Sequence, residues 1–114
     1  MLNESRRLDL AYHALADPTR RGMLARLSRS PASVSELARP FSMSLPAVMQ
    51  HLQLLEASGL VTSEKNGRVR TCRVEPQALA AAGGWIAEQR ALWESRADRF
   101  ADYLDTMKGE ENGR

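Results

Sequence analysis

The stretch from Ser44 to Ser58 combines two serine hydroxyls and two glutamine amides with apolar residues at helical spacing. The side-chain amide of Gln50 could bond both N6 and N7 of adenine. Leu45 and Met49 could pack against thymine methyl groups. The alternative is an ordinary surface helix with two stray exposed apolar residues. Because Leu45 and Met49 lie four residues apart, on one side of a helix, contact with DNA is the favoured interpretation.

Basic residues cluster in the segment that follows, at Lys65, Arg68, Arg70 and Arg73. The Asn66-Gly67 pair is typical of a tight hairpin turn. Strand alternation would place Arg68 and Arg70 on one face. There arginine can enter a narrow minor groove or pair with phosphate. A charged edge strand that resists aggregation is the alternative, but the density of positive charge favours the groove.

Two capped helices are needed to hold these outward side chains. Ser33 and Glu36 have the spacing of a capping box, and the helix they open is expected to end at Arg39, before a proline. Ser44 caps the next helix, and Gly59 supplies its left-handed stop. Its inward stripe is predicted to be Val48, Leu52 and Leu55. The predicted major-groove contacts on its outer side are Ser44, Leu45, Ala47, Met49, Gln50 and Gln53.

Further helices flank this motif. The pattern predicts one helix over about residues 5–15, one capped by Asp17 with Pro18 in its first turn, and a long one over about residues 77–107. Gly83 and Gly84 are a candidate interruption of the long helix, since each glycine costs roughly 1 kcal/mol against alanine. The predicted fold class is mainly α with a small β-hairpin. It is a homodimeric winged helix-turn-helix with the order α-α-α-α-β-β-α.

The long helix carries more apolar surface than a small domain could cover, so a monomer would expose a large patch. Packing on the first helix covers part of it, and a second copy of the chain covers the larger part. Two-fold symmetry would then place two copies of the helix capped by Ser44, the reading helix, about one DNA turn, ~34 Å, apart. The predicted dimerisation residues are Leu8, Tyr12, Trp85, Leu92, Trp93, Phe100, Tyr103 and Leu104.

Charge is distributed unevenly along the chain. The formal net charge is only +2, yet the segment from Arg20 to Arg73 holds nine basic and three acidic residues, a charge of +6. From Val74 to the end, five basic and eight acidic residues give −3. A solvated basic surface is one interpretation. Positive charge gathered around a helix-turn-helix and a hairpin is also typical of a surface that binds a phosphate backbone.

The length of 114 residues predicts one domain, over residues 1–108, followed by a disordered tail at 109–114. No apolar run approaches the ~20 residues that span a bilayer, and no apolar segment follows Arg6 and Arg7 as in a signal peptide. We therefore expect a cytoplasmic protein without a membrane partner. The single cysteine, Cys72, allows no disulfide framework within one chain, which fits a reducing compartment.

Enzymatic function is not supported by the residue inventory. The chain has no imidazole or thiol beyond His13, His51 and Cys72, and it has no glycine-rich phosphate loop. None of the three has a nucleophile or base partner near it in sequence. We therefore predict no catalytic residue, no cofactor and no metal.

Together the motifs resemble the ArsR family of winged-helix repressors over about residues 8–76. The matching segments are Ala16-Asp17-Pro18-Thr19-Arg20-Arg21, Ser35-Glu36-Leu37-Ala38, Ala47-Val48-Met49-Gln50-His51-Leu52 and Glu56-Ala57-Ser58-Gly59-Leu60-Val61. The segments from Gly67 to Pro76 and from Arg90 to Glu94 are similar to one branch of the family. The resemblance implies a DNA-binding repressor that dimerises through its C-terminal helix.

The family's metal ligands are missing from this chain. Metal-sensing members carry a Cys-x-Cys pair where this sequence has Ser35-Glu36-Leu37, and others carry histidine on the C-terminal helix, which here has none. In the reading helix, the family commonly has a polar residue at Leu45, serine at Met49 and lysine at Gln53. These departures shift the expected base reading to thymine methyl packing, Gln50 and the arginines of the wing.

The sequence thus favours a metal-independent homodimeric repressor that binds an inverted repeat in double-stranded DNA of its own promoter. One alternative is a protein-interaction module that uses Leu45 and Met49 as a partner surface and binds no DNA. Another is a ligand- or thiol-responsive repressor acting through Cys72. A small-molecule effector of unknown kind also stays open as a partner.

Overall fold

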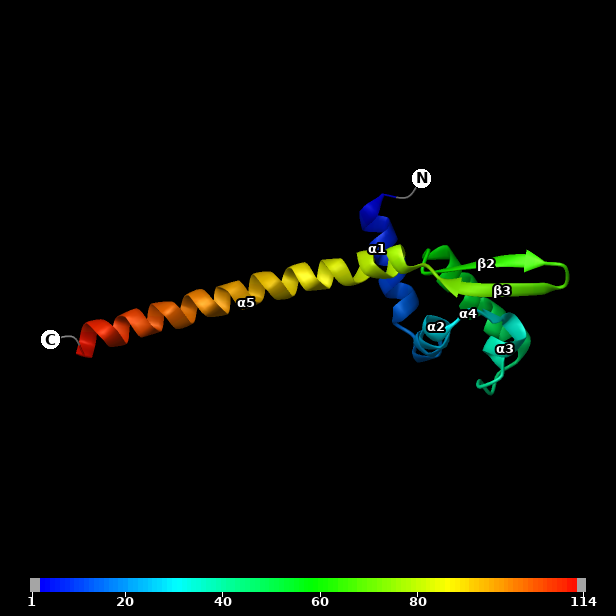
Figure 1. Cartoon of the computed structure of the whole chain (residues 1–114), viewed down its shortest axis with the longest axis horizontal. Helices are drawn as coiled ribbons and strands as arrows, with labels where there is room; N and C mark the ends of the chain where they lie inside the picture. Colours follow the sequence, from blue (N-terminus) through cyan, green and yellow to red (C-terminus); the bar gives the residue numbers. More distant parts are fainter. Residues whose placement is uncertain (1–2, 113–114) are drawn as a thin grey trace. The chain divides into compact units, whose positions relative to one another are not determined.

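Five helices and three short strands follow one another in the computed structural model, which describes residues 3–112 (Figure 1). The elements are α1 (Glu4–Leu15), α2 (Pro18–Arg29), β1 (Ala32–Ser33), α3 (Val34–Ala38), α4 (Leu45–Ala57), β2 (Val61–Asn66), β3 (Val69–Val74) and α5 (Pro76–Asn112). The chain forms two compact units, the first up to Ala82 and the second from Gly83 onward. The predicted fold class, mainly helical with a small antiparallel hairpin, is confirmed.

The first two helices are fixed by their N-caps. The side chain of Asn3, which we did not predict as a cap, accepts a hydrogen bond from the Arg6 amide at 2.8 Å, and α1 therefore begins at Glu4. Asp17 caps α2 as predicted and accepts from the Arg20 amide at 3.0 Å. The buried line of α1 consists of Ala11 and Ala14, because small side chains let it lie close to α2 and α4.

The helix-turn-helix comprises α3 and α4. The capping box is confirmed, since Ser33 Oγ accepts from the Glu36 amide at 3.1 Å and Glu36 Oε1 accepts from the Ser33 amide at 3.4 Å. The helix ends at Ala38, one residue before the predicted end at Arg39. A residue before proline is expected to leave helical geometry, and this expectation is wrong here. Arg39 keeps helical dihedral angles (φ −50°, ψ −48°). The helix stops because Pro40 has no amide hydrogen with which to continue the hydrogen-bond ladder.

The sheet has the strand order β1-β3-β2, and both pairings are antiparallel. The hairpin turn lies one residue later than predicted, because Asn66 pairs with Val69 and leaves Gly67 and Arg68 as the loop. Gly67 has φ 66°, which suits glycine at the first position of a two-residue turn. β1 was not predicted. It consists of two residues, and it exists only through its pairing with β3.

The core of the first unit lies under α4 and the sheet. The predicted inward stripe of α4 is confirmed, since Val48, Leu52 and Leu55 are fully buried. Further members of the same cluster are Ala11, Ala14, Met23, Leu24, Leu27, Ala32, Leu37, Leu60, Val61, Cys72 and Ala82. One core thus includes residues of α1, α2, α4 and the hairpin, and it fixes where the outer side of α4 faces.

The long helix α5 differs from the prediction at two places. It runs through Gly83 and Gly84 without an interruption, and neither glycine adopts a positive φ. It also continues to Asn112, past the boundary at residue 108 where we expected a disordered tail. Gly109 weakens a helix but does not end it without a left-handed conformation, which it lacks. Residues 113 and 114 of that predicted tail lie outside the described residues. No helix within residues 3–112 combines the length and apolar character that a bilayer crossing requires.

Candidate nucleic-acid interface

The outer side of α4 presents the predicted polar contacts to solvent. Ser44 Oγ accepts from the Ala47 amide at 3.3 Å, which anchors the first turn, while its own hydroxyl hydrogen stays free to donate. Leu45 follows with 54% of its surface exposed, and Gln50 and Gln53 are exposed farther along. The helix therefore offers amide groups and one apolar side chain that could reach base edges.

Two predicted contacts on α4 are less accessible than expected. Met49 is half-buried and packs against the core, because a flexible thioether chain folds back into space beside the buried stripe. Ala47 is also half-buried. Conversely, Leu54 is 39% exposed and was overlooked. The signal was present, since only one of the adjacent Leu54 and Leu55 can face the core of a helix.

Two arginines of the wing, the hairpin formed by β2 and β3, form no hydrogen bond or ion pair with the described residues. Arg68 lies in the turn itself and Arg70 lies on β3, and neither has a hydrogen-bond or ion-pair partner in the described part of the chain. Arg73, by contrast, holds Glu64 across the hairpin at 2.9 Å. The basic cluster predicted from the sequence is therefore not uniform. Arg68 and Arg70, near the tip of the hairpin, are unpaired among the described residues, whereas Arg73, farther from the tip, forms an ion pair.

Several contacts attach the hairpin to the C-terminal end of α4. Gly59 ends the helix with φ 81°, as predicted, and the Ser58 hydroxyl then accepts from the Leu60 amide at 3.2 Å. Ser63 on β2 donates to the carboxylate of Glu56 on α4. Because these bonds join consecutive elements, the position of the wing is tied to that of α4.

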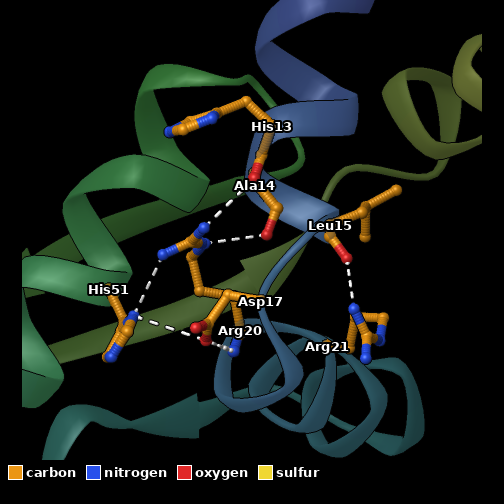
Figure 2. A network of polar contacts seen from close by, with 7 residues as sticks. All are labelled: His13, Ala14, Leu15, Asp17, Arg20, Arg21 and His51. Carbon is orange, nitrogen blue, oxygen red and sulfur yellow. Dashed lines mark hydrogen bonds and ion pairs between the residues drawn. The ribbon is translucent and has the colours of Figure 1, made fainter.

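A second set of contacts ties α4 to the first two helices, as Figure 2 shows. Arg20, only 8% exposed, donates from Nε to the Ala14 carbonyl at 2.8 Å and from Nη2 to the His13 carbonyl at 3.1 Å. Its Nη1 lies 3.2 Å from Nδ1 of His51 on α4. The same His51 nitrogen lies 3.8 Å from Oδ2 of Asp17. Sequence analysis assigned no role to Arg20, because these contacts join residues far apart in the chain.

Asp17 is held in its ionised form at this junction. The hydrogen bond from the Arg20 amide lowers the pKa of the carboxyl group below its ordinary value, and the positive charge of the Arg20 guanidinium adds to that effect. A carboxyl group whose pKa is lowered by folding contributes stability above its unfolded pKa. That stability is lost as the pH falls through the folded pKa.

Replacing Asp17 with asparagine should therefore reduce stability in a pH-dependent way. Asparagine remains a good N-cap but carries no charge. We expect Asp17→Asn to unfold at a lower temperature than the wild type at neutral pH. The difference should begin to shrink as the pH drops below the ordinary carboxyl value of 3.8, and it should vanish once the pH is below the lowered pKa of the folded protein. Thermal melts across this range measure it, and a difference that persists unchanged at acid pH would contradict the assignment.

The predicted dimerisation residues divide between two environments. Leu8 and Tyr12 on α1 are half-buried, and the Tyr12 hydroxyl donates to the Ala82 carbonyl within the first unit. The predicted residues on α5 are exposed in the single chain: Trp85, Leu92, Trp93, Phe100, Tyr103 and Leu104. The prediction omitted Ile86 and Met107, which are exposed too. Ile86, Trp93, Phe100 and Met107 recur every seven residues, a spacing that could have identified them.

Cys72 does not have the surroundings of a reactive thiol. It is fully buried on β3, and burial, followed by the negative charge of Glu56, raises the pKa of its thiol. Since the thiolate is the reactive form, this environment disfavours a thiol switch. No three His, Cys, Asp or Glu side chains gather into a possible metal site among residues 3–112. The absence of a metal stays a prediction from the ligand types.

Comparisons with known proteins agree with this architecture. A helix-turn-helix domain family matches residues 15–64. The chain is 45% identical over 98 residues to the HTH-type transcriptional regulator Rv2034 of Mycobacterium tuberculosis, covering 86% of this chain and 89% of that protein. This relative spans the helix-turn-helix and most of the flanking helices.

Solved structures lead to the same family. The crystal structure of the ArsR family transcriptional regulator RHA00566 is 53% identical, covers 83% of this chain and 98% of its own, and superposes with a TM-score of 0.76. A solution structure of Mb0332 from Mycobacterium bovis, described as a homodimeric winged helix-turn-helix DNA-binding domain, is 26% identical with a TM-score of 0.54. It covers 88% of this chain and 83% of its own. The fold and these relatives together show that this chain belongs to the ArsR family of winged helix-turn-helix DNA-binding transcriptional regulators.

Proposed function

We propose that this protein is a metal-independent homodimeric repressor that binds an inverted repeat in its own promoter region. The observation that carries the proposal is the outer side of α4. It is capped at Ser44 and exposed at Leu45, Gln50 and Gln53. It is joined to the rest of the first unit at its middle, through His51, and at its C-terminal end, through Glu56. A rigid helix with exposed amides suits direct reading of bases in the major groove.

Base reading divides between two kinds of side chain on α4. Gln50 and Gln53 each supply a donor and an acceptor on one amide, which matches the major-groove edge of adenine. Leu45 supplies an exposed apolar group for a thymine methyl. With Met49 packed against the core, the apolar contribution falls mainly on Leu45. The operator should therefore be rich in A·T pairs at the positions that α4 reads.

The wing supplies sequence-independent affinity in this proposal. Arg68 and Arg70 are exposed and unpaired, so no existing ion pair has to break when they meet phosphate. Their place at the hairpin tip suits a narrow minor groove or the backbone beside it. The wing and α4 would thus contact neighbouring parts of one half-site.

The exposed stripe on α5 supports a dimer. Ile86, Trp93, Phe100 and Met107 lie on one helical face, and Trp93 alone exposes 69% of its surface. Exposing four large apolar side chains on one face to water is unfavourable. A second copy of the same helix offers a matching apolar face that could cover them. Two-fold symmetry in the protein then implies an inverted repeat in the DNA.

Metal independence is proposed on the chemistry of the residues. The position of the family's Cys-x-Cys ligands holds Ser35, Glu36 and Leu37, and α5 has no histidine. Glu36 is already engaged by Ser33, whose hydrogen bonds lower the pKa of its carboxyl group. Soft metals need thiolate or imidazole donors, which these positions lack.

Fluorescence anisotropy tests the proposal directly. The protein is titrated onto its own upstream DNA and onto a scrambled duplex of the same composition, at two salt concentrations. We expect tight, salt-sensitive binding that favours the upstream DNA, and it should be unchanged by a metal chelator. Equal binding to both duplexes would contradict the proposed operator. If the protein bound no DNA but captured a partner protein in a way that salt does not weaken, the result would support an interaction module.

Replacing Gln50 with alanine should relax base preference at one position in each half-site. The lost amide contacts are worth about 1–3 kcal/mol of discrimination, or roughly 5- to 150-fold. Competition with duplexes that vary one base pair at a time measures this. Gln77, an exposed glutamine on the first turn of α5 and away from α4 in sequence, provides a control as Gln77→Ala. Unchanged preference at every base pair would remove Gln50 from the interface.

A further inference from the structure

We propose that Arg20 is a positioning residue for base recognition, because it joins α4 to the C-terminal end of α1 and so fixes the angle at which Gln50 and Gln53 meet the bases. The proposal rests on the proposed reading of DNA by α4 and adds a residue that touches no DNA itself. Its predicted signature is a loss of sequence discrimination without a loss of affinity for the phosphate backbone.

All three nitrogens of the Arg20 guanidinium contact protein atoms. Nε and Nη2 donate to the carbonyls of Ala14 and His13, and Nη1 meets His51 on α4 (Figure 2). Arg20 is also the one charged side chain among the described residues that is buried. A buried cation with three protein partners is not available to phosphate, so any effect of Arg20 on DNA binding has to act through α4.

The partners of Arg20 explain why an arginine is required. The carbonyls of His13 and Ala14 lie in the last turn of α1, where the helix dipole favours a cation. The His13 carbonyl also accepts from the Ala16 amide at 3.2 Å, so the arginine adds a second hydrogen bond there. The guanidinium can face these carbonyls on one edge and His51 on another because its donors are fixed in a planar fork. A lysine ammonium in the same place is a single point of charge and cannot hold both sides with the same geometry.

The contact with His51 is directional. Arginine carries only donors, so Nδ1 of His51 must be the acceptor, and the ring hydrogen then lies on Nε2. His51 is half-buried and directly follows Gln50 on α4. A rotation of α4 about its axis would therefore displace Nδ1 and the amide of Gln50 together. Recognition geometry of this kind tolerates only about 0.5 Å of displacement.

Base contacts and phosphate contacts respond differently to such a displacement. A bidentate amide-base pair needs good distance and alignment, whereas attraction to the backbone is long-range and tolerant. Losing the bond between Arg20 and His51 should therefore reduce binding to the operator and leave binding to unrelated DNA nearly intact. A residue needed only for folding would reduce both together.

The neighbouring Arg21 provides a matched control. It lies on the same helix and also donates to a carbonyl near the end of α1, from Nη1 to Leu15 at 2.7 Å. It is exposed, however, and within residues 3–112 no hydrogen bond or ion pair joins it to α4. Arg20→Lys and Arg21→Lys thus make the same chemical change one residue apart, and only the first removes the connection to His51.

The experiment compares Arg20→Lys, Arg21→Lys, His51→Leu and His51→Asn on the operator and on a scrambled duplex at two salt concentrations. Asparagine keeps an acceptor near the position of Nδ1, and leucine removes it. We expect Arg20→Lys and His51→Leu each to lower the ratio of operator to scrambled affinity by about tenfold, as for one hydrogen bond to a charged group. Arg21→Lys and His51→Asn should stay near the wild type. The double variant Arg20→Lys/His51→Leu should be no worse than either single one, since both remove one interaction.

Two further measurements keep the outcome decisive. Thermal melts establish that each variant is folded at the assay temperature. In ¹⁵N spectra of the histidine rings, Arg20→Lys should shift the Nδ1 signal of His51, and Arg21→Lys should not. Equal losses on both duplexes, or an Arg20→Lys variant that discriminates as well as the wild type, would overturn the positioning role. A wild type that binds both duplexes equally would overturn the proposed function as well.

Discussion

Replacing Phe100 with glutamate is expected to convert the proposed dimer into monomers and to weaken operator binding by at least about 100-fold. Phe100 lies in the middle of the seven-residue series on α5 and is exposed in the single chain. A carboxylate buried against a second copy of this face would lose its hydration without gaining a partner. Each monomer would then bind one half-site alone, and the gain from linking two half-sites, typically 10²–10⁴-fold, would be lost.

Sedimentation and anisotropy on the same samples test this expectation. Ser95→Glu makes the matched change on another side of α5, where the sequence is polar and Arg99 lies one turn away. That variant should remain dimeric and bind normally. Circular dichroism checks that both variants keep their helix content. A Phe100→Glu protein that stays dimeric would show that this face of α5 is not the interface.

Removing both wing arginines should weaken binding to every DNA sequence and reduce its dependence on salt. Arg68 and Arg70 have no partner among the residues described, so each can displace counterions from a phosphate. Two lost phosphate contacts should lower the slope of log affinity against log salt by about 1.8 per subunit, or about 3.6 for a bound dimer. At moderate salt we expect roughly a 10- to 100-fold loss for Arg68→Ala/Arg70→Ala, equal on operator and scrambled DNA.

Arg73 provides the control for this experiment. It belongs to the same hairpin and carries the same charge, but it already holds Glu64 at 2.9 Å. Arg73→Ala should therefore change the salt slope much less than either tip arginine. If all three arginines contributed equally, general charge and not the position of the tip would account for the affinity. If the double variant lost only its base preference, the wing would read sequence directly.

Features of the chain set by near neighbours in sequence could be predicted. The caps at Asp17, Ser33 and Ser44 and the stop at Gly59 depend on residues within about four positions, and all are confirmed. The inward stripe of α4 follows from helical periodicity in the same way. These local rules were sufficient for the helix-turn-helix and for the buried stripe of α4.

Features that depend on distant residues were not predicted. The burial of Met49, the strand pairing of Ala32 and Ser33, and the contact between Arg20 and His51 all need the folded arrangement of several elements. The hairpin turn was wrong by one residue for a related reason. Asn66-Gly67 is a favourable turn pair by itself, but the register between β2 and β3 decides which two residues form the loop.

The short strand β1 divides the wing into a fixed base and an independent tip. β1 pairs with Thr71 and Cys72 only, so the hairpin beyond them, from Lys65 to Arg70, is paired only with itself. Ser33 also caps α3, so the fixed base is continuous with the helix-turn-helix. A tip of this kind can lengthen or shorten in steps of two residues, one on each strand, and keep the inward and outward faces of the base unchanged. Related regulators could therefore acquire new groove contacts at the tip while the reading helix stays as it is, and a designer could exchange tips on the same principle.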